Sequence, residues 1–248
     1  MVRVLIDLRR TIARHQLAST HPGVLVAAVL LGVLSAVGTL LLGWARYAHP
    51  AAATDVLALV FLLWMGGRLA QCALSGEPIL RPELFALLPL PRRRLGHALL
   101  LVGLLDPANL LLALALAATV PMGARLGPAA AVTGAVAMLL TALLTSLLGT
   151  LATGLLGPAA RRGHDAGTVV TAVLISVLAV GGTLLPALIS ALRHRTAPWL
   201  SDLLRALPSG WGPQSVEAAG RADIVGALLP LLGLLLLAGL LEIGRAHV

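Results

Sequence analysis

The amino-acid sequence predicts an all-α membrane protein: a polytopic bundle of about six transmembrane helices with an interfacial amphipathic helix at its N-terminus. Hydrophobic residues make up 58% of the 248 residues, and charged residues only 11%. A water-soluble domain of this length cannot bury so much apolar surface in one core, whereas lipid solvates apolar side chains directly. Long apolar runs alternate with arginine-rich segments, which is the pattern of membrane spans and their cytoplasmic loops.

The first segment, MVRVLIDLRRTIARHQ, is amphipathic at helical spacing. The residues of its polar face recur three or four positions apart: Arg3, Asp7, Arg10 and Arg14. Apolar residues lie on the opposite face: Leu5, Leu8 and Ile12. We expect this helix to lie on the inner membrane surface, with its guanidinium groups toward lipid phosphates. It serves either as a topological anchor or as an interface helix that transmits movement from a cytoplasmic partner.

Six apolar runs are long enough, or nearly so, to cross a hydrocarbon core of about 30 Å. They cover residues 24–45, 56–74, 95–120, 127–156, 168–192 and 224–241. The fourth run is over-long and is expected to tilt or to extend beyond the bilayer. Residues 1–241 are therefore predicted to form one transmembrane domain, with a largely ordered outer loop before the last span.

The last seven residues, EIGRAHV, differ in character from the span before them. They match the translation of GAGATCGGAAGAGCACACGTC, which resembles a common sequencing adapter. Our hypothesis is that residues 242–248 are a non-native tail and that the natural chain continues past Leu241. Resequencing the locus tests this, because a genuine stop codon after Val248 would contradict it.

The arginines set the orientation. With the N-terminus in the cytoplasm, the inner segments hold Arg3, Arg9, Arg10, Arg14, Arg81, Arg92, Arg93, Arg94, Arg161 and Arg162, whereas the two short outer loops hold only Arg46 and Arg125. The positive-inside rule therefore predicts a multi-pass plasma-membrane protein with a cytoplasmic N-terminus. The net charge of +8 has the same explanation. We expect no nucleic-acid partner, because no basic stripe is interleaved with stacking aromatic residues.

Catalytic chemistry is not expected in this chain. All 18 basic residues are arginine, and a P-loop needs a lysine to reach the nucleotide phosphates. The histidines are scattered without metal-ligand spacing, and no nucleophile elbow occurs. We therefore expect no catalytic site, metal site or cofactor here. Any hydrolysis of ATP, with its Mg²⁺, belongs to a partner subunit.

The segment between the second and third runs, SGEPILRPELFALLPLPRRRLG, predicts a stiff structural unit. Four prolines, at 78, 82, 89 and 91, bracket a short apolar helix over residues 83–88. Prolines stop helices and fix the entering chain. Three arginines, Arg92–Arg94, then anchor the segment at the membrane surface. The alternative is a positive-inside loop with no further role.

The pattern ELFALLPLPRRRLGHALL, after two spans and an amphipathic N-terminus, resembles the permease subunits of type-2 ATP-binding-cassette exporters, particularly the large actinobacterial ones. The segment LLRALPSGWGPQSVEAAGRAD, before the last span, resembles them too, and the likeness covers nearly all of residues 1–241. It implies that the chain forms a translocation path driven by a separate ATP-binding-cassette ATPase subunit. Membrane lipids and a second permease half or copy are the other implied partners. By resemblance, the residues that couple to the ATPase are Glu83, Leu84, Phe85, Leu88, Arg92, Arg93 and Arg94.

Two charged residues fall within the predicted spans, Arg68 in the second and Asp106 in the third. Residue counting places them at similar depth, and a charge there costs several kcal/mol unless it is paired. The sequence therefore predicts an Arg68–Asp106 ion pair. In the alternative interpretation, Asp106 caps a helix restarted at Pro107 while Arg68 extends toward the inner interface. A role for Asp106 in solute binding or proton relay is a third possibility.

Aromatic and small residues add weaker signals. We expect Trp44, Tyr47, Trp199 and Trp211 at the outer interface, and Trp64 to serve in packing. A stripe of small residues in the fourth run, Thr145, Gly149, Thr153 and Gly157, favours close helix packing, with lining of a solute path as the alternative. Two other functions stay open: a secondary transporter or channel, and a non-transporting membrane assembly subunit.

Overall fold

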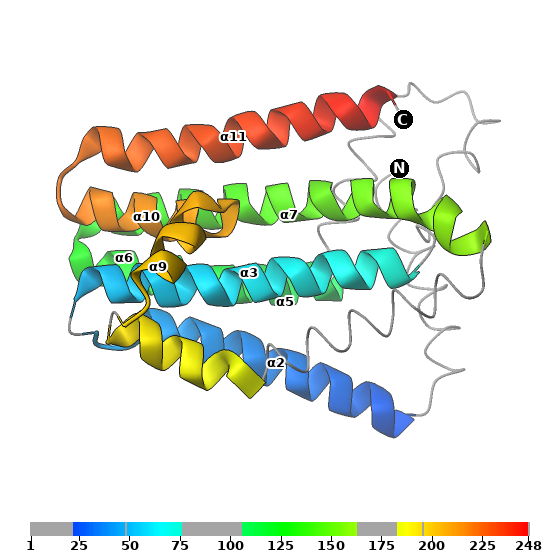
Figure 1. Ribbon diagram of the computed structural model, residues 1–248, viewed down its shortest axis with the longest axis horizontal. Coiled ribbons are helices and arrows are strands. Elements are labelled where there is room, and N and C mark those ends of the chain that lie inside the picture. Colours follow the sequence, from blue (N-terminus) through cyan, green and yellow to red (C-terminus); the bar gives the residue numbers. More distant parts are fainter. Residues whose placement is uncertain (1–21, 48, 76–105, 163–182, 195, 248) are drawn as a thin grey trace.

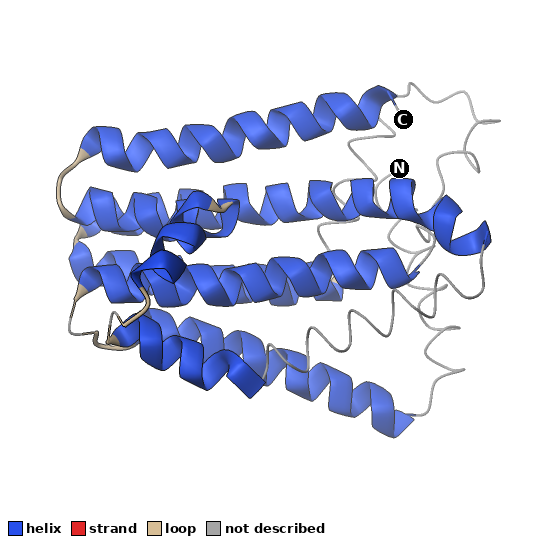
Figure 2. Ribbon diagram, viewed as in Figure 1, coloured by secondary structure: helices blue, strands red, loops and turns tan. Residues whose placement is uncertain are grey.

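The computed structural model describes residues 22–47, 49–75, 106–162, 183–194 and 196–247, and in these ranges the regular structure is helical (Figure 2). The helices are α2 (Pro22–Trp44), α3 (Pro50–Ser75), α5 (Pro107–Leu116), α6 (Thr119–Leu126), α7 (Pro128–Arg162), α9 (Pro198–Ala206), α10 (Pro208–Gly220) and α11 (Ile224–His247). A further apolar helix covers Thr183–Arg193. The predicted all-α class is confirmed for this part of the chain.

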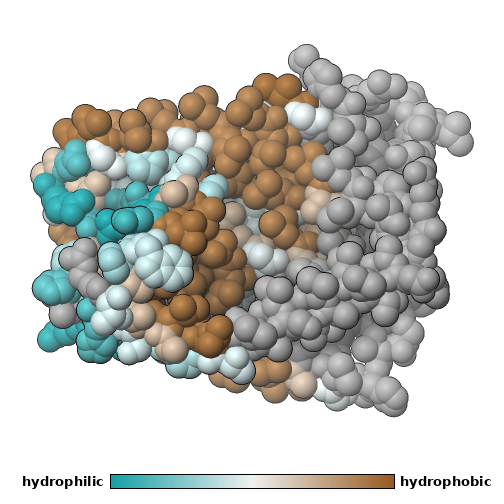
Figure 3. Space-filling model, viewed as in Figure 1, coloured by the Kyte–Doolittle hydropathy of each residue, from teal (hydrophilic) through white to brown (hydrophobic). Residues whose placement is uncertain are grey.

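The long helices lie side by side along the longest axis of the molecule (Figure 1). The links from α2 to α3, from α6 to α7 and from α10 to α11 all lie at one end of the bundle, here called the connection end. Hydrophilic residues gather at this end, and hydrophobic residues cover the helices beyond it (Figure 3). This distribution suits a bundle whose middle is surrounded by hydrocarbon and whose end reaches polar surroundings.

Four helical segments are long and apolar enough to cross a membrane: Pro50–Cys72, Pro107–Leu126, Pro128–Thr153 and Ile224–Gly244. The outer face of α11 shows the same character, since it exposes the large side chains of Ile224, Val225, Leu228, Leu229, Leu232, Leu235, Leu236, Leu240 and Ile243. The chain is therefore a membrane-embedded helical protein. The six-span count stays a prediction, and the predicted N-terminal interfacial helix, with Arg3, Arg10 and Arg14, lies outside the described residues.

Proline sets where most of these helices begin. A proline is the first residue of α2, α3, α5, α7, α9 and α10. The first turn of a helix has no use for the missing N–H, and the fixed φ of proline already suits a helix. The α7 helix runs for 35 residues, which agrees with the expectation that the fourth run extends beyond the length needed to cross a bilayer.

The third run differs from its expected form. Its helical segment does not end at residue 120 but continues to Leu126, and it is broken into α5 and α6 at Ala117–Ala118. Pro121 explains the break, because it has no N–H to donate to the carbonyl of Ala117 and its ring would clash there. The Ala117 carbonyl instead accepts a hydrogen bond from the amide of Val120, at 3.0 Å.

The segment before the last run is the larger departure. It was expected as an outer loop with Trp211 at the interface, yet its helix α10 packs against α3, α7 and α11 inside the bundle. Val216 is fully buried in the same cluster as Leu57 and Leu116. The Trp211 ring packs into a cluster with Met65 and Leu144. Trp199, in contrast, is 66% exposed, as an interfacial position requires.

Candidate functional site

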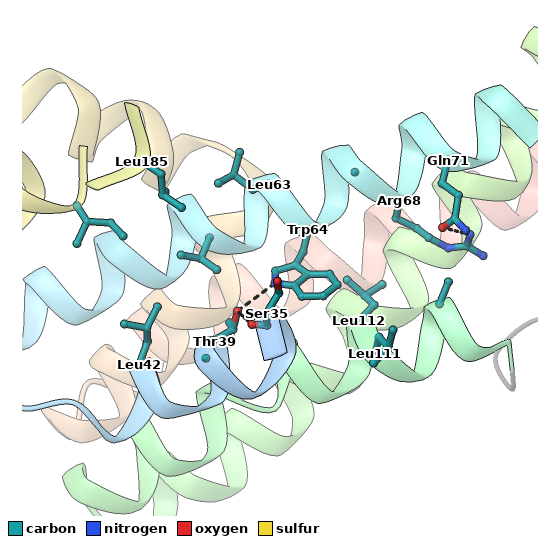
Figure 4. A pocket seen from close by; sticks show the side chains of 15 residues that line it. Ser35, Thr39, Leu42, Leu63, Trp64, Arg68, Gln71, Leu111, Leu112 and Leu185 are labelled. Carbon is teal, nitrogen blue, oxygen red and sulfur yellow. Dashed lines mark hydrogen bonds between the residues drawn. The ribbon is translucent and has the colours of Figure 1, made fainter. Parts of the chain in front are cut away.

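A cavity of about 650 Å³ lies between α2, α3, α5 and the helix Thr183–Arg193 (Figure 4). Most of its wall is aliphatic and comes from four elements: Leu42 of α2, Val60 and Leu63 of α3, Leu111 and Leu112 of α5, and Leu185 and Ile189 of the helix Thr183–Arg193. The polar and aromatic side chains of the wall are Ser35, Thr39, Trp64, Arg68 and Gln71. The volume falls within the range of pockets that bind small molecules, roughly 300–1,000 Å³.

Two glycines help to keep this space open. Gly38 on α2 and Gly67 on α3 both line the cavity, and a Cβ atom at either position would have no atom within 4 Å. These two glycines therefore do not serve a close approach of two helix backbones. A side chain at either position would have room to enter the cavity.

Trp64 lies in the middle of the cavity wall, between the aliphatic part and the charged end (Figure 4). Its indole Nε1 donates a hydrogen bond to Thr39 Oγ1 at 3.1 Å. The Thr39 hydroxyl in turn donates to the carbonyl of Ser35 at 2.8 Å. The expectation that Trp64 serves only in packing is therefore incomplete, because its ring also forms cavity surface.

The charged end of the cavity contains the ion pair that the sequence predicted. Arg68 Nη2 lies 3.0 Å from Asp106 Oδ2, and the two side chains are 15% and 22% exposed. Arg68 Nε donates to Asn109 Oδ1 at 2.9 Å, and its Nη1 donates to Gln71 Oε1 at 3.0 Å. Asp106 also occupies the N-cap position of α5, but its side chain makes no capping hydrogen bond. The carboxylate thus serves Arg68 and not the helix end.

Asn109 is a member of this group that the sequence interpretation missed. It is 7% exposed and is the only asparagine of the chain. The available signal was its spacing, since Asp106 and Asn109 lie three residues apart on one helix, as Arg68 and Gln71 do on another. Four polar side chains on two facing helices thus satisfy one another within an apolar bundle.

We expect substitution of Arg68 by methionine to destabilise the protein by about 1.5–3 kcal/mol, the usual contribution of hydrogen bonds to a charged group. Unfolding of the purified protein in detergent, followed by circular dichroism, measures this loss. Arg68→Lys should recover only part of it, because an ammonium cannot reproduce the fixed fork of a guanidinium toward Asp106 and Asn109. Equal stability of the wild type and Arg68→Met would contradict the prediction.

A second polar group, the connection-end cluster, consists of Thr54, Asp55, Ser201, Arg205, Glu217 and Arg221. Asp55 of α3 is fully buried and Glu217 of α10 is 4% exposed. Arg205 of α9 lies between them, with Nε 2.8 Å from Asp55 Oδ1 and Nη2 3.7 Å from Glu217 Oε2. Two buried carboxylates and one cation therefore join three helices.

The remaining members complete the cluster. Ser201 donates to Asp55 Oδ2 at 2.6 Å, and Thr54 donates to Glu217 Oε2 at 2.7 Å. Arg221 Nη1 lies 2.9 Å from Glu217 Oε1, so the two carboxylates have two cations. Burial by itself lowers the pKa of the Arg205 guanidinium, but the hydrogen bond to Asp55 and the nearby charges of Asp55 and Glu217 raise the pKa above its ordinary value. The Arg205 guanidinium therefore stays protonated within the cluster.

Other predicted positions have clear structural roles. Arg125, expected in a short outer loop, donates to the carbonyls of Trp44 and Ala45 and so binds the C-terminal end of α2. Arg193 lies over the Tyr47 ring, 5.4 Å from its centroid. The coupling residues implied by the resemblance, Glu83, Leu84, Phe85, Leu88 and Arg92–Arg94, lie outside the described residues. In the small-residue stripe, Gly149 faces the Cys72 side chain, which supports the packing interpretation there.

No protein-family model, no curated protein and no solved structure matches the chain. The cavity and the two polar clusters therefore have to be interpreted from their own chemistry. Among the residues that the structure describes, no group of three or more His, Cys, Asp or Glu side chains could hold a metal ion.

Proposed function

We propose that this chain is the membrane-spanning permease of an ATP-driven exporter, coupled to a separate ATP-binding-cassette ATPase subunit. The observation that carries the proposal is the cavity of about 650 Å³ within a bundle of apolar helices. A partly open space of this size between apolar helices can admit a small molecule, which favours a transport role over that of an anchor. The sequence resemblance supports a separate ATPase subunit, and so does the lack of any lysine in this chain for a P-loop.

In the proposed mechanism the partner supplies the energy and this chain supplies the path. The protein lies in the plasma membrane with its N-terminus in the cytoplasm, and the ATPase binds its inner face. Closure of the ATPase on ATP moves the spans through the segment 83–94 and changes which side of the membrane the path faces. A second permease half or copy provides the facing wall.

Copurification tests the proposed partner. The tagged chain, extracted in mild detergent from its native membranes, is expected to retain a P-loop ATPase. Charge reversal of Arg92–Arg94 to glutamate should abolish this retention, because it removes the cations that the resemblance assigns to the contact. The matched control is Arg46→Glu, which reverses an exposed arginine at the connection end. Equal loss of the ATPase in both variants, or no ATPase with the wild type, would contradict the proposal.

A secondary transporter is the alternative from another class. The Arg68–Asp106 pair at the cavity favours it, because paired charges inside a bundle are a common basis of ion coupling. Proteoliposomes that contain the chain alone separate the two functions. Solute flux driven by a proton gradient without any ATPase supports the secondary transporter, and flux only with the ATPase and ATP supports the exporter. A non-transporting assembly subunit would show neither.

A further inference from the structure

We propose that the cavity between α2, α3 and α5 binds an uncharged, mainly apolar molecule, which contacts the ring of Trp64. The binding itself is inferred from the cavity. That the bound molecule belongs to the class of transported substrates rests on the proposed function. The charge, the hydrogen-bonding groups and the size of the cavity each favour this class of ligand.

The charge at the cavity is already balanced. Arg68 is the cation of its wall, and its three guanidinium nitrogens each donate to a different protein acceptor, on Asp106, Asn109 and Gln71. An anionic ligand at Arg68 would lie beside the Asp106 carboxylate and would add a negative charge to a pair that is already neutral. It would also lose its own hydration in an apolar site. The cavity therefore disfavours anions.

Two hydrogen-bonding groups of the wall, on Trp64 and Thr39, are also occupied. The Trp64 N–H donates to Thr39, and the Thr39 hydroxyl donates to a backbone carbonyl. A polar ligand would gain few new hydrogen bonds in return for the water that it gives up. An apolar ligand loses no hydrogen bonds and gains dispersion contacts with the indole ring and with aliphatic neighbours such as Leu111, Leu112 and Ile189.

The size of the cavity fits the same class. About 650 Å³ is ample for a fused-ring compound or a folded acyl chain, and lies inside the usual range for small-molecule pockets. The lining glycines make the space testable. A leucine at position 67 meets no atom within 4 Å of its Cβ and can extend into the cavity. A leucine at the neighbouring position 66 also has free space around its Cβ, but Gly66 does not line the cavity.

Two probes that differ by one charge test the proposal. N-phenyl-1-naphthylamine is neutral, and 8-anilinonaphthalene-1-sulfonate has a similar ring system with an added sulfonate. The protein is the full chain in nanodiscs with Trp44, Trp199 and Trp211 replaced by phenylalanine, so that energy transfer to the probe comes from Trp64. We expect saturable transfer to the neutral probe, and at least about tenfold weaker binding of the anionic one.

The glycine variants then assign the binding to the cavity. Gly67→Leu should weaken saturable binding of the neutral probe at least about tenfold, whereas Gly66→Leu should leave it unchanged. Both changes replace a glycine in the same helix by a better helix former, so neither should impair folding. Equal binding of the two probes, or equal effects of the two leucines, would overturn the proposal. These results do not depend on an ATPase, so failure here differs from failure of the copurification experiment.

Discussion

Replacement of Arg205 by methionine is expected to lower the free energy of unfolding by about 3–5 kcal/mol, the cost of leaving a buried charge without its partner. Asp55 is fully buried, and Arg205 is the cation within ion-pair distance of it among the described residues. Without Arg205, the Ser201 hydroxyl, at 2.6 Å, remains as a hydrogen-bond donor to the Asp55 carboxylate. Unfolding of the purified protein in mixed micelles, followed by tryptophan fluorescence, measures the loss.

Two further variants show whether the effect comes from the buried charge. Arg46→Met removes an exposed arginine from the same end of the bundle and should change stability by less than about 0.5 kcal/mol. The double variant Asp55→Asn/Arg205→Met should recover part of the loss, because it removes the unpaired carboxylate while leaving an oxygen for Ser201. If Asp55→Asn lowers the free energy of unfolding as much in the Arg205→Met background as in the wild type, the loss of the ion pair is not the cause.

Replacement of Gly43 by alanine is expected to destabilise the protein by about 2–3 kcal/mol, the upper part of the range for overpacking. A Cβ at this position would overlap the carbonyl oxygen of Ala118 and lie 3.0 Å from Pro121 Cγ. The obstacle is backbone at the break between α5 and α6, so no change of rotamer can relieve it. Only glycine allows α2 to approach the break this closely.

The matched control lies five residues earlier on the same helix. Gly38→Ala should stabilise the protein by about 0.5–1 kcal/mol, because alanine is the better helix former and its methyl group enters open space. The two substitutions are chemically identical and are expected to have opposite signs. Thermal unfolding of both variants in one detergent provides the comparison. A destabilisation of similar size in both variants would contradict the prediction, because the overlap with the Ala118 carbonyl exists only at position 43.

Hydrophobicity along the chain was enough to predict the class of the protein. The runs that contain α3, α7 and α11 are apolar for about the thickness of a bilayer, and the structure forms helices over each of them. The Arg68–Asp106 pair was also predictable, because a charge within an apolar helix needs a partner and the partner has to lie at similar depth. The prolines that begin the helices are equally local signals.

The sequence alone therefore indicated that the chain is a membrane-embedded helical protein and that a buried charge must be paired. Only the tertiary structure decided that α10, a polar segment, packs inside the bundle, and that Arg205 joins Asp55 across 150 positions of sequence. It also decided where the helices leave a cavity beside Trp64. The physical reason is that polar residues such as Glu217 resemble a surface loop until their partners are known. Burying them becomes favourable only when distant helices supply the opposite charges and hydrogen bonds.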